Sequence, residues 1–323
     1  MRVRLINSIV VLLTSARAVT MRKRPQITAT EANERHRVEP GYVLRHHWPE
    51  YLMEAGGLGI FMVSACVGTV ILEHPASPIH QMMPHAFWRR VVLGGAMALT
   101  AVGVIYSPWG QQSGAHVNPA ITLTYLRLKK IAPPDAAFYV LAQFLGGLAG
   151  VLLVAIVLDG LLSQPAVNFA VTVPGVYGPT AAFGAEVAIA FLMMLMVLTA
   201  TNSRRVSHLT GVFAGLLIAC YVTLEAPISG FGMNPARSFA SALPARSWAF
   251  LWIYFVAPLL GMLSASEVWL WIKGVGSVSC AKLNHQTRRR CIFYCDYLAR
   301  ASSAHHSDSY SSAQPAACPD RAM

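Results

Sequence analysis

The sequence predicts an all-α membrane protein with six transmembrane helices and two re-entrant half-helices, arranged as two inverted repeats. Three observations predict this fold. Of the 323 residues, 55% are hydrophobic and only 12% are charged, which is about half the charged share of a soluble protein. Six long apolar runs are spread along the chain, and the triplet Asn-Pro-Ala interrupts the apolar sequence once in each half.

The six apolar runs are long enough, or nearly so, to cross about 30 Å of hydrocarbon as helices. Helices are expected because the backbone polar groups of a span in lipid must find partners within protein. The fifth run is the shortest. The expected spans are residues 51–72, 89–107, 136–158, 180–202, 208–225 and 249–272, which together define a membrane domain over residues 49–274.

The net charge of +11 is distributed unevenly over the segments that connect the spans. If both termini lie in the cytoplasm, the inner side holds nine Lys and Arg before residue 50, three at 127–130, two at 204–205 and seven after residue 272. Four basic residues are then left for the outer side. This positive-inside pattern fixes the orientation of membrane proteins. It predicts cytoplasmic termini and explains the basic charge without nucleic acid as a partner.

Polar segments flank the membrane domain. We expect residues 1–48 to form a flexible, basic N-terminal extension, with Met21 as an alternative start. The first twenty residues also fit a signal peptide, but its removal would leave the new N-terminus on the outer side, against the charge pattern. Residues 275–323 form the expected cytoplasmic tail, on the side where thiols stay reduced.

The two halves of the chain repeat the same order of features. Glu54 stands near the start of the first span and Glu186 near the start of the fourth, and each half continues with a second span, an Asn-Pro-Ala loop and a third span. Because three spans per half is an odd number, the second half enters the membrane from the opposite side. The two loops therefore begin on opposite sides and can meet at the middle of the bilayer.

Each Asn-Pro pair predicts the start of a helix, since Asn is a preferred N-cap and Pro is favoured at the first helical position. The predicted helices, 119–130 and 235–243, are too short to span the bilayer. Each must dip in from its own side with its N-terminus at the centre. Non-helical backbone at that depth is tolerated where it is buried in protein or faces water, so the polar turns are expected to line a narrow aqueous path.

These features together resemble the aquaporin family, the major intrinsic proteins, and more narrowly a bacterial-type channel of that family. The resemblance rests on "SGAHVNPAITL", "GFGMNPARSF", the paired glutamates and "AQFLGG" in the third span, and it covers about residues 51–272. It implies a right-handed bundle with one pore per subunit, a homotetramer, and a plasma or inner membrane protein with cytoplasmic termini. The implied pore residues are Asn118, Pro119, Ala120, Asn234, Pro235 and Ala236.

The resemblance also implies roles for residues around the two triplets. Glu54 and Glu186 would support the pore loops by accepting hydrogen bonds from them. These hydrogen bonds would also offset the free-energy cost of placing a carboxylate within a span. His116 would hydrogen-bond locally near the cytoplasmic mouth, with a pH gate as the alternative. The outer selectivity constriction would consist of Ala98, Val222, Phe231 and Arg237, and a one-residue shift would put Met97 in place of Ala98.

The implied constriction departs from that of water-selective members of the family. Those members usually have an aromatic residue and a histidine where this chain has Ala98 and Val222. A wider and less polar constriction should admit larger neutral molecules. Ser238, and the pair Tyr254 and Phe255 in the last span, instead match the water channels of the family.

The tail segment "CAKLNHQTRRRCIFYC" carries a second chemical signal. Cys280, His285, Cys291 and Cys295 could supply the sulfur and nitrogen ligands that suit zinc, although their spacing matches no standard zinc finger. The alternative is a cytoplasmic amphipathic segment whose arginines meet anionic lipid and whose cysteines are acylated.

The sequence thus predicts a passive channel for water that also admits small uncharged solutes and excludes ions and protons. Its expected partners are those solutes, the lipid bilayer and three further copies of the chain. No cofactor is expected and the chain is not expected to be an enzyme, because it carries no Walker A loop, catalytic triad spacing or cofactor fingerprint. Two alternatives stay open: a glycerol-type facilitator, and a membrane-anchored metal or redox sensor built on residues 280–295.

Overall fold

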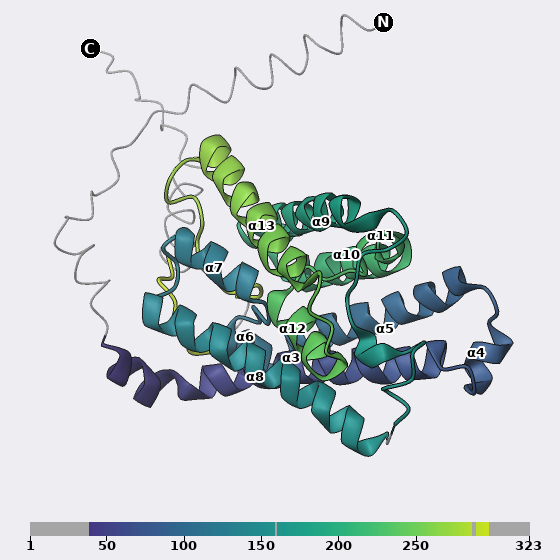
Figure 1. The fold of residues 1–323 in the computed structure, drawn as a ribbon. Helices are drawn as coiled ribbons and strands as arrows, with labels where there is room; N and C mark the ends of the chain where they lie inside the picture. The colour runs from purple at the N-terminus through teal and green to yellow at the C-terminus, as the bar shows by residue number, and fades with distance from the viewer. Residues whose placement is uncertain (1–38, 159, 286–288, 297–323) are drawn as a thin grey trace, which may run out of the picture. The chain divides into compact units, whose positions relative to one another are not determined.

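The computed structural model describes residues 39–158, 160–285 and 289–296 (Figure 1). These residues form helices and no strand. Six of the helices are long and apolar enough to cross a membrane, as the sequence predicts. They are α3 (Pro40–Glu73), α5 (Ala86–Tyr106), α8 (Pro133–Val157), α9 (Gly178–Thr201), α10 (Thr210–Leu224) and α13 (Leu251–Lys273). The expected extension up to residue 38, with its alternative start at Met21, and the end of the tail after residue 296 lie outside the described residues.

The first span begins earlier than predicted, at Pro40, so residues 40–48 are helical and not part of a flexible extension. Proline suits a first helical position because the N–H that it lacks would have no partner there. The added turns are held by His47, whose Nδ1 lies 2.7 Å from Oδ1 of Asp135 in α8, and by Tyr42, which stacks on His46. These helical turns could not be predicted from hydropathy, because the segment is polar.

Two short helices, α7 (Pro119–Arg127) and α12 (Pro235–Ala245), lie inside the bundle. At about 1.5 Å per residue, their 9 and 11 residues cannot cross the bilayer. Helix α7 ends three residues before the prediction. Helix α12 continues through Pro244, where the prediction ended it, because the backbone N–H groups of Arg246 and Ser247 still bond to carbonyls within the helix.

The two halves of the chain form equivalent helix pairs. Helix α3 packs along α8 in the first half, and α9 packs along α13 in the second, while α5 packs against α10 across the halves. Both pairs depend on a glycine at the crossing: a Cβ on Gly146 would lie 2.1 Å from the carbonyl oxygen of Ala55, and one on Gly261 would lie 2.4 Å from that of Val187. The repeat seen in the sequence is therefore also a repeat of packing.

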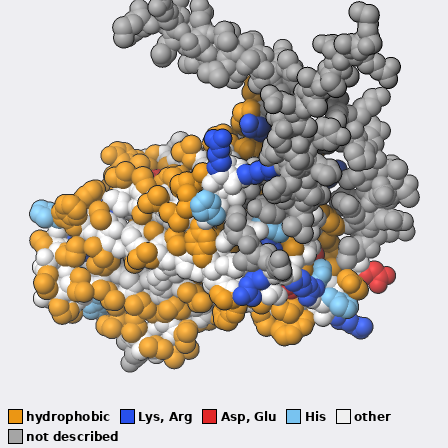
Figure 2. All heavy atoms as spheres, turned by 180° about the vertical axis from the view of Figure 1, so that it is seen from behind, with side chains coloured by type: hydrophobic (Ala, Val, Ile, Leu, Met, Phe, Trp, Pro, Cys, Tyr) orange, Lys and Arg blue, Asp and Glu red, His pale blue; other side chains and the backbone are white. Residues whose placement is uncertain are grey.

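The outer surface of the bundle is apolar. Figure 2 shows hydrophobic side chains over most of the described face, with Lys and Arg gathered toward one end. Large hydrophobic residues such as Leu99, Ile156 and Leu216 are well exposed on the spans. An apolar surface of this extent fits contact with lipid.

Short helices lie in the connections between the spans. They are α4 (Pro78–Met82), α6 (Pro108–Ser113), α11 (Ala226–Ser229) and the 3-10 turns η1 (Asn168–Ala170) and η2 (Ser207–Leu209).

Candidate functional site

The site is built around the N-termini of α7 and α12. Asn118 caps α7, with Oδ1 accepting the N–H of Ala120 at 2.9 Å. Asn234 caps α12, with Oδ1 accepting the N–H groups of Ala236 at 3.1 Å and Arg237 at 3.2 Å. Each cap satisfies N–H groups that the first turn of a helix leaves without intrahelical partners. The two Asn-Pro-Ala triplets therefore start two helices, as their sequence predicts.

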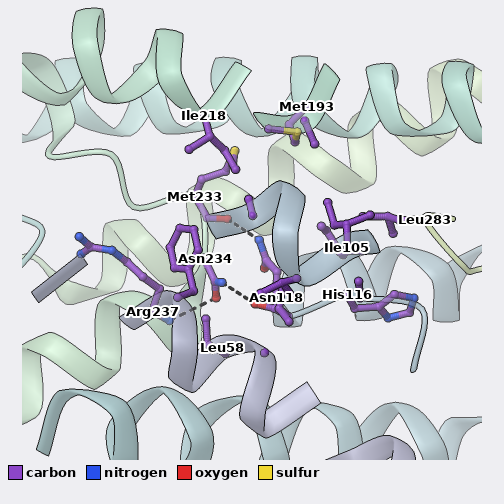
Figure 3. A pocket seen from close by; sticks show the side chains of 18 of the residues that line it. Leu58, Ile105, His116, Asn118, Met193, Ile218, Met233, Asn234, Arg237 and Leu283 are labelled. Atoms are coloured by element: carbon purple, nitrogen blue, oxygen red, sulfur yellow. Dashed lines mark hydrogen bonds between the residues drawn. The ribbon is translucent and has the colours of Figure 1, made fainter. Parts of the chain in front are cut away.

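The two caps are also joined to each other across the middle of the bundle (Figure 3). Nδ2 of Asn118 donates to the carbonyl of Met233 at 2.9 Å, and Nδ2 of Asn234 donates to the carbonyl of Val117 at 2.7 Å. Each half thus holds the loop of the other half. An amide has two N–H groups, so each asparagine keeps a second one that can face a passing molecule.

The loops that lead into the caps have an unusual backbone with the same pattern in both halves. Gly114 and Gly230 have φ of 95° and 86°. Among non-glycine residues, Ala115 and Phe231 have φ of 55° and 56°, and Val117 and Met233 have φ of 39° and 48°. Left-handed backbone at a non-glycine residue costs about 1–3 kcal/mol, so the surrounding structure must hold each loop.

Two buried glutamates hold these loops, as the family resemblance implies. Glu54 accepts hydrogen bonds from the Ser113 hydroxyl and from the backbone N–H groups of His116 and Val117 at 2.6–3.0 Å. Its second oxygen also accepts the Gln143 amide at 2.8 Å.

Glu186 does the same in the second half. It accepts the Ser229 hydroxyl and the N–H groups of Gly232 and Met233, each at 2.6 Å. Both glutamates are fully buried. Each satisfies, from a neighbouring span, loop groups that have no helical partner.

Other residues of this support were missed by the sequence analysis. Ser113 and Ser229 bond both to a glutamate and to the loop backbone two residues later. Their carbonyls accept the hydroxyls of Tyr139 and Tyr254. The shared Ser-Gly that opens both loops was the available signal, since the two motifs read "SGAHVNP" and "SGFGMNP".

A cavity of about 90 Å³ lies between the half-helices and the spans. A water molecule needs about 10–15 Å³ on this scale, so the cavity has room for a short file of waters. In Figure 3, Arg237 lies at one end, His116 and Leu283 lie at the other, and Asn118 and Asn234 lie between them. We call the Arg237 end the outer end and the His116 end the inner end.

A second cavity lies beyond Arg237 and has the predicted constriction residues Val222, Phe231 and Arg237 in its wall. Met97 also lines this cavity and Ala98 does not, so the alternative by one position fits the fourth place of the predicted constriction. The backbone of Ala98 instead faces Gly215 of α10. The spacing from Asn118 could not fix the rotation of α5 to within one residue.

Arg237 lies between the two cavities. Arg237, Phe231 and Phe61 line both of them, so they form the wall that separates the two spaces. Nη1 of Arg237 is buried without a hydrogen-bond partner among the described residues. A guanidinium N–H in this position is available to a polar molecule that moves between the cavities. Phe61 of α3 carried no motif that the sequence analysis could have recognised.

His116 is fully buried at the inner end. Its ring lies between those of Tyr125 and Phe293, with centroids 5.1 and 5.3 Å away and nearly parallel planes. Nδ1 lies 3.1 Å from the Thr122 hydroxyl, and Nε2 lies 2.9 Å from the carbonyl oxygen of Ala281. These partners of the His116 ring come from α7 and from the C-terminal tail.

The tail brings together the four residues that the sequence analysis singled out. The ligand atoms of Cys280, His285, Cys291 and Cys295 all lie within 4.8 Å of one another. Burial lowers the pKa of His285, but hydrogen bonds to Cys291 and Cys295 outweigh this effect and raise that pKa to about 9. Sequence spacing alone could not show that these four side chains converge.

Comparison with known proteins identifies the family. The major intrinsic protein family matches residues 45–269. The aquaporin NIP2-3 of Zea mays is 33% identical over 233 residues, which cover 71% of this chain and 75% of that protein. The aquaporin NIP6-1 of Arabidopsis thaliana is 29% identical over 209 residues, covering 64% and 67% of the two chains. Another Arabidopsis thaliana relative is 37% identical, and the chain spans 59% of its length.

A solved structure has the same fold. The aquaglyceroporin from Plasmodium falciparum superposes with a TM-score of 0.58, at 20% identity, over 71% of this chain and 96% of that one. The family match covers most of the chain, and the Zea mays relative is matched over 71% of it. The chain belongs to the major intrinsic protein family, whose aquaporins are membrane channels and not enzymes.

Proposed function

We propose that this channel conducts water and small neutral solutes passively, and that it excludes ions and protons. The observation that carries the proposal is the meeting of Asn118 and Asn234 on the wall of one cavity, each capping a half-helix and each bonded to the opposite loop. Their remaining N–H groups offer two donors to one oxygen in single file. A water molecule or a hydroxyl group can accept both.

Exclusion of cations follows from the charges at the same place. The N-terminus of a helix carries about half a positive charge, and two such ends meet at Asn118 and Asn234. The guanidinium of Arg237 adds a full charge at the outer end of the cavity. A cation that enters would meet positive potential twice and would lose its hydration shell, and fixed charges and half-helix dipoles exclude protons and cations in this way.

The outer constriction favours neutral solutes beyond water. Its wall includes the apolar side chains of Met97, Val222 and Phe231, and its polar side chains are those of Arg237, Arg90 and Thr69. Such a wall offers few hydrogen bonds to replace those that water loses on entry, and it can contact the carbon atoms of a small solute. A glycerol-type or other neutral-solute facilitator is therefore the second candidate.

We also propose a cytoplasmic location for the inner end. The inner loops hold Arg127, Lys129, Lys130, Arg204 and Arg205, and short basic loops stay on the cytoplasmic side. A homotetramer and a plasma or inner membrane location are carried over from the family.

The proposal is tested by stopped-flow swelling and shrinking of proteoliposomes, with water compared against glycerol and urea. The full chain is measured beside Leu283→Gly, which removes a tail side chain from the inner end of the cavity, so that a covered pore is not mistaken for an inactive one. We expect osmotic water flux above that of empty liposomes and no proton conductance. If neither protein exceeds empty liposomes for any of these solutes, the proposal is wrong.

A matched pair of variants on α10 assigns the flux to this cavity. Ile218 lines the cavity, whereas Leu216 is 63% exposed on the lipid side of the same helix. Ile218→Trp should abolish flux, and Leu216→Trp should leave it unchanged. Gel filtration in detergent confirms that both variants are folded. Equal flux in the two folded variants would place the path elsewhere.

A further inference from the structure

Four metal-ligating side chains of the tail lie together outside the membrane-spanning helices. The Sγ atoms of Cys280 and Cys291 are 3.6 Å apart, and Sγ of Cys295 is 3.0 Å from Nε2 of His285. The four ligand atoms come from two strips of chain, 280–285 and 291–295, and all lie within 4.8 Å of one another. Because the Cys280–Cys291 pair and the His285–Cys295 pair lie close together, the four ligand atoms can surround one metal ion.

The spacing of these atoms fits a tetrahedral zinc ion. With Zn–S bonds of about 2.3 Å, two sulfurs of a tetrahedron are about 3.8 Å apart, close to the distance between Cys280 and Cys291. The other distances are at most 4.8 Å, so they exceed the tetrahedral value by about 1 Å at most. Three thiolates and one imidazole form a standard set for structural zinc, in which the protein closes all four positions. The softer sulfur ligands also disfavour magnesium and calcium.

A metal would give the described part of the tail a fastening that secondary structure does not supply. Residues 277–285 and 289–296 contain no helix or strand, yet Ala281, Lys282 and Leu283 are at most 4% exposed. The base of the segment is closed by the N–H of Asp296, which donates to the carbonyl of Ser279 at 2.8 Å. Small folds with little core of their own are usually stabilised by disulfides or a metal.

The same segment covers the inner end of the cavity. The carbonyl oxygen of Ala281 lies within hydrogen-bond distance of Nε2 of His116, and the Phe293 ring stacks on the His116 ring. The N–H of Leu283 donates to the carbonyl of Gly114 at 3.1 Å, and the Leu283 side chain forms part of the cavity wall, as Figure 3 shows. The pore loop of the first half is thus bound directly by the tail.

Polar contacts fasten the tail to the surrounding helix ends. Nζ of Lys282 donates to the carbonyl of Gln111 in α6 at 2.9 Å, and within the tail it donates to the carbonyl of Arg290 at 2.6 Å. Nζ of Lys130 lies 2.7 Å from Oδ2 of Asp296. These contacts fix where the segment lies. The cluster of Cys280, His285, Cys291 and Cys295 fixes its internal fold.

We propose that Cys280, His285, Cys291 and Cys295 bind one zinc ion, and that this ion holds the tail as a plug over the inner end of the pore. Loss of zinc lets the loop around Leu283 leave the cavity wall and opens the pore. The metal site stands on its own, while the plug rests on the channel function proposed above.

The metal site is tested on the full chain purified in detergent with a reductant, by elemental analysis and by cobalt substitution. We expect one zinc ion per chain, and cobalt absorption bands typical of thiolate ligands in a tetrahedral site. Changes to outer-shell partners already cost about 10–100-fold in metal affinity, so Cys291→Ser and Cys295→Ser, which remove direct ligands, should weaken binding by more than that. Cys220→Ser is the matched control, since Cys220 is an exposed cysteine on α10, and it should keep the full zinc content.

The plug is tested by water flux of the same proteins in liposomes, with zinc present and after chelation. Zinc-depleted wild type and Cys291→Ser should conduct several-fold faster than zinc-bound wild type, and readdition of zinc should slow the wild type alone. Leu283→Gly should conduct faster while still binding zinc. Cys220→Ser should respond to zinc like the wild type.

Different outcomes overturn different parts of the proposal. Wild-type protein that holds no stoichiometric zinc after loading, or that forms a disulfide between Cys280 and Cys291 under reducing conditions, overturns the metal site. Full zinc content with equal flux before and after chelation overturns the plug. Absence of flux in every variant, including Leu283→Gly and the chelated protein, would instead contradict the channel function and leave the metal site supported by its own measurement.

Discussion

The inner pore loop, residues 113–118, and the outer pore loop, residues 229–234, are built to one plan but have different neighbours. In both, a serine, a buried glutamate and a tyrosine from the third span of the half hold the same backbone. The inner loop then has His116 where the outer loop has Gly232, and it lies under the tail. The outer loop instead opens onto a second cavity beside Arg237.

This difference teaches which features a half-pore requires. The backbone conformation, its hydrogen-bond partners and the capping asparagine are repeated in both halves, so we infer that they are needed wherever a half-helix starts inside the membrane. The side chains that face the two mouths differ, which indicates that they set what each mouth does. Variants made in matched pairs, one in each half, can separate these two kinds of feature.

The largest expected difference concerns Glu54→Gln and Glu186→Gln. The new amide group faces backbone donors in both variants, and each unsatisfied buried donor costs about 1–3 kcal/mol. In the first half, Oε1 of Gln143 has no partner among the described residues. By turning its own amide, Gln143 can accept from the new group at position 54. In the second half, Pro258 holds the corresponding position, four residues after Tyr254 as Gln143 is four after Tyr139.

We therefore expect Glu186→Gln to lower the stability in detergent and the water flux much more than Glu54→Gln does. Thermal unfolding followed by fluorescence, together with proteoliposome swelling, measures both effects. In the double variant Glu54→Gln with Gln143→Leu, the new amide at position 54 has no such acceptor. This variant should therefore lose stability and flux as Glu186→Gln does. Equal damage from the two single variants would show that Gln143 gives no rescue.

A smaller difference is expected for the two capping asparagines. Loss of an N-cap costs about 1 kcal/mol, and the lost bond to the opposite loop costs about the same, so both Asn118→Ala and Asn234→Ala should destabilise the channel. Asn234→Ala should cost more, since Asn234 caps the N–H groups of both Ala236 and Arg237. It should also loosen Arg237 and raise proton leak, whereas Asn118→Ala should not. Thermal unfolding and a pH-sensitive dye inside liposomes measure the two effects, and equal leak in both variants would contradict this account.

The next prediction concerns the outer mouth alone. Arg237→Ala removes the fixed charge between the two cavities and should raise cation and proton leak roughly tenfold, the factor that corresponds to about 1.4 kcal/mol of lost barrier. Arg246→Ala is the control, because Arg246 is an exposed arginine at the end of the same helix. It should leave the leak unchanged. Conductance of proteoliposomes under a potassium gradient measures the leak. A folded Arg237→Ala channel with no increase in cation or proton leak would show that the charge of Arg237 does not exclude cations.

The sequence allowed prediction of the features that depend on short stretches of chain. The six apolar spans, the two N-caps and the paired glutamates each have a local pattern, and the structure contains all of them. Features that depend on contacts between distant segments were not predictable. The rotation of α5, which selects Met97 over Ala98, is set by packing against α10. The docking of Leu283 beside Gly114 joins residues with no common motif.

The smallest expected effect tests the part of the plan that the two halves share most closely. Tyr139→Phe and Tyr254→Phe each remove one hydroxyl that donates to a serine carbonyl at the start of a pore loop. A buried hydrogen bond contributes about 1 kcal/mol, so both variants should lower stability by that amount and leave flux nearly unchanged. The two losses should be equal, and they should add in the double variant because the tyrosines lie in different halves. Thermal unfolding of the single and double variants measures this, and a clearly larger loss for one tyrosine would mean that the two loops are not held in the same way.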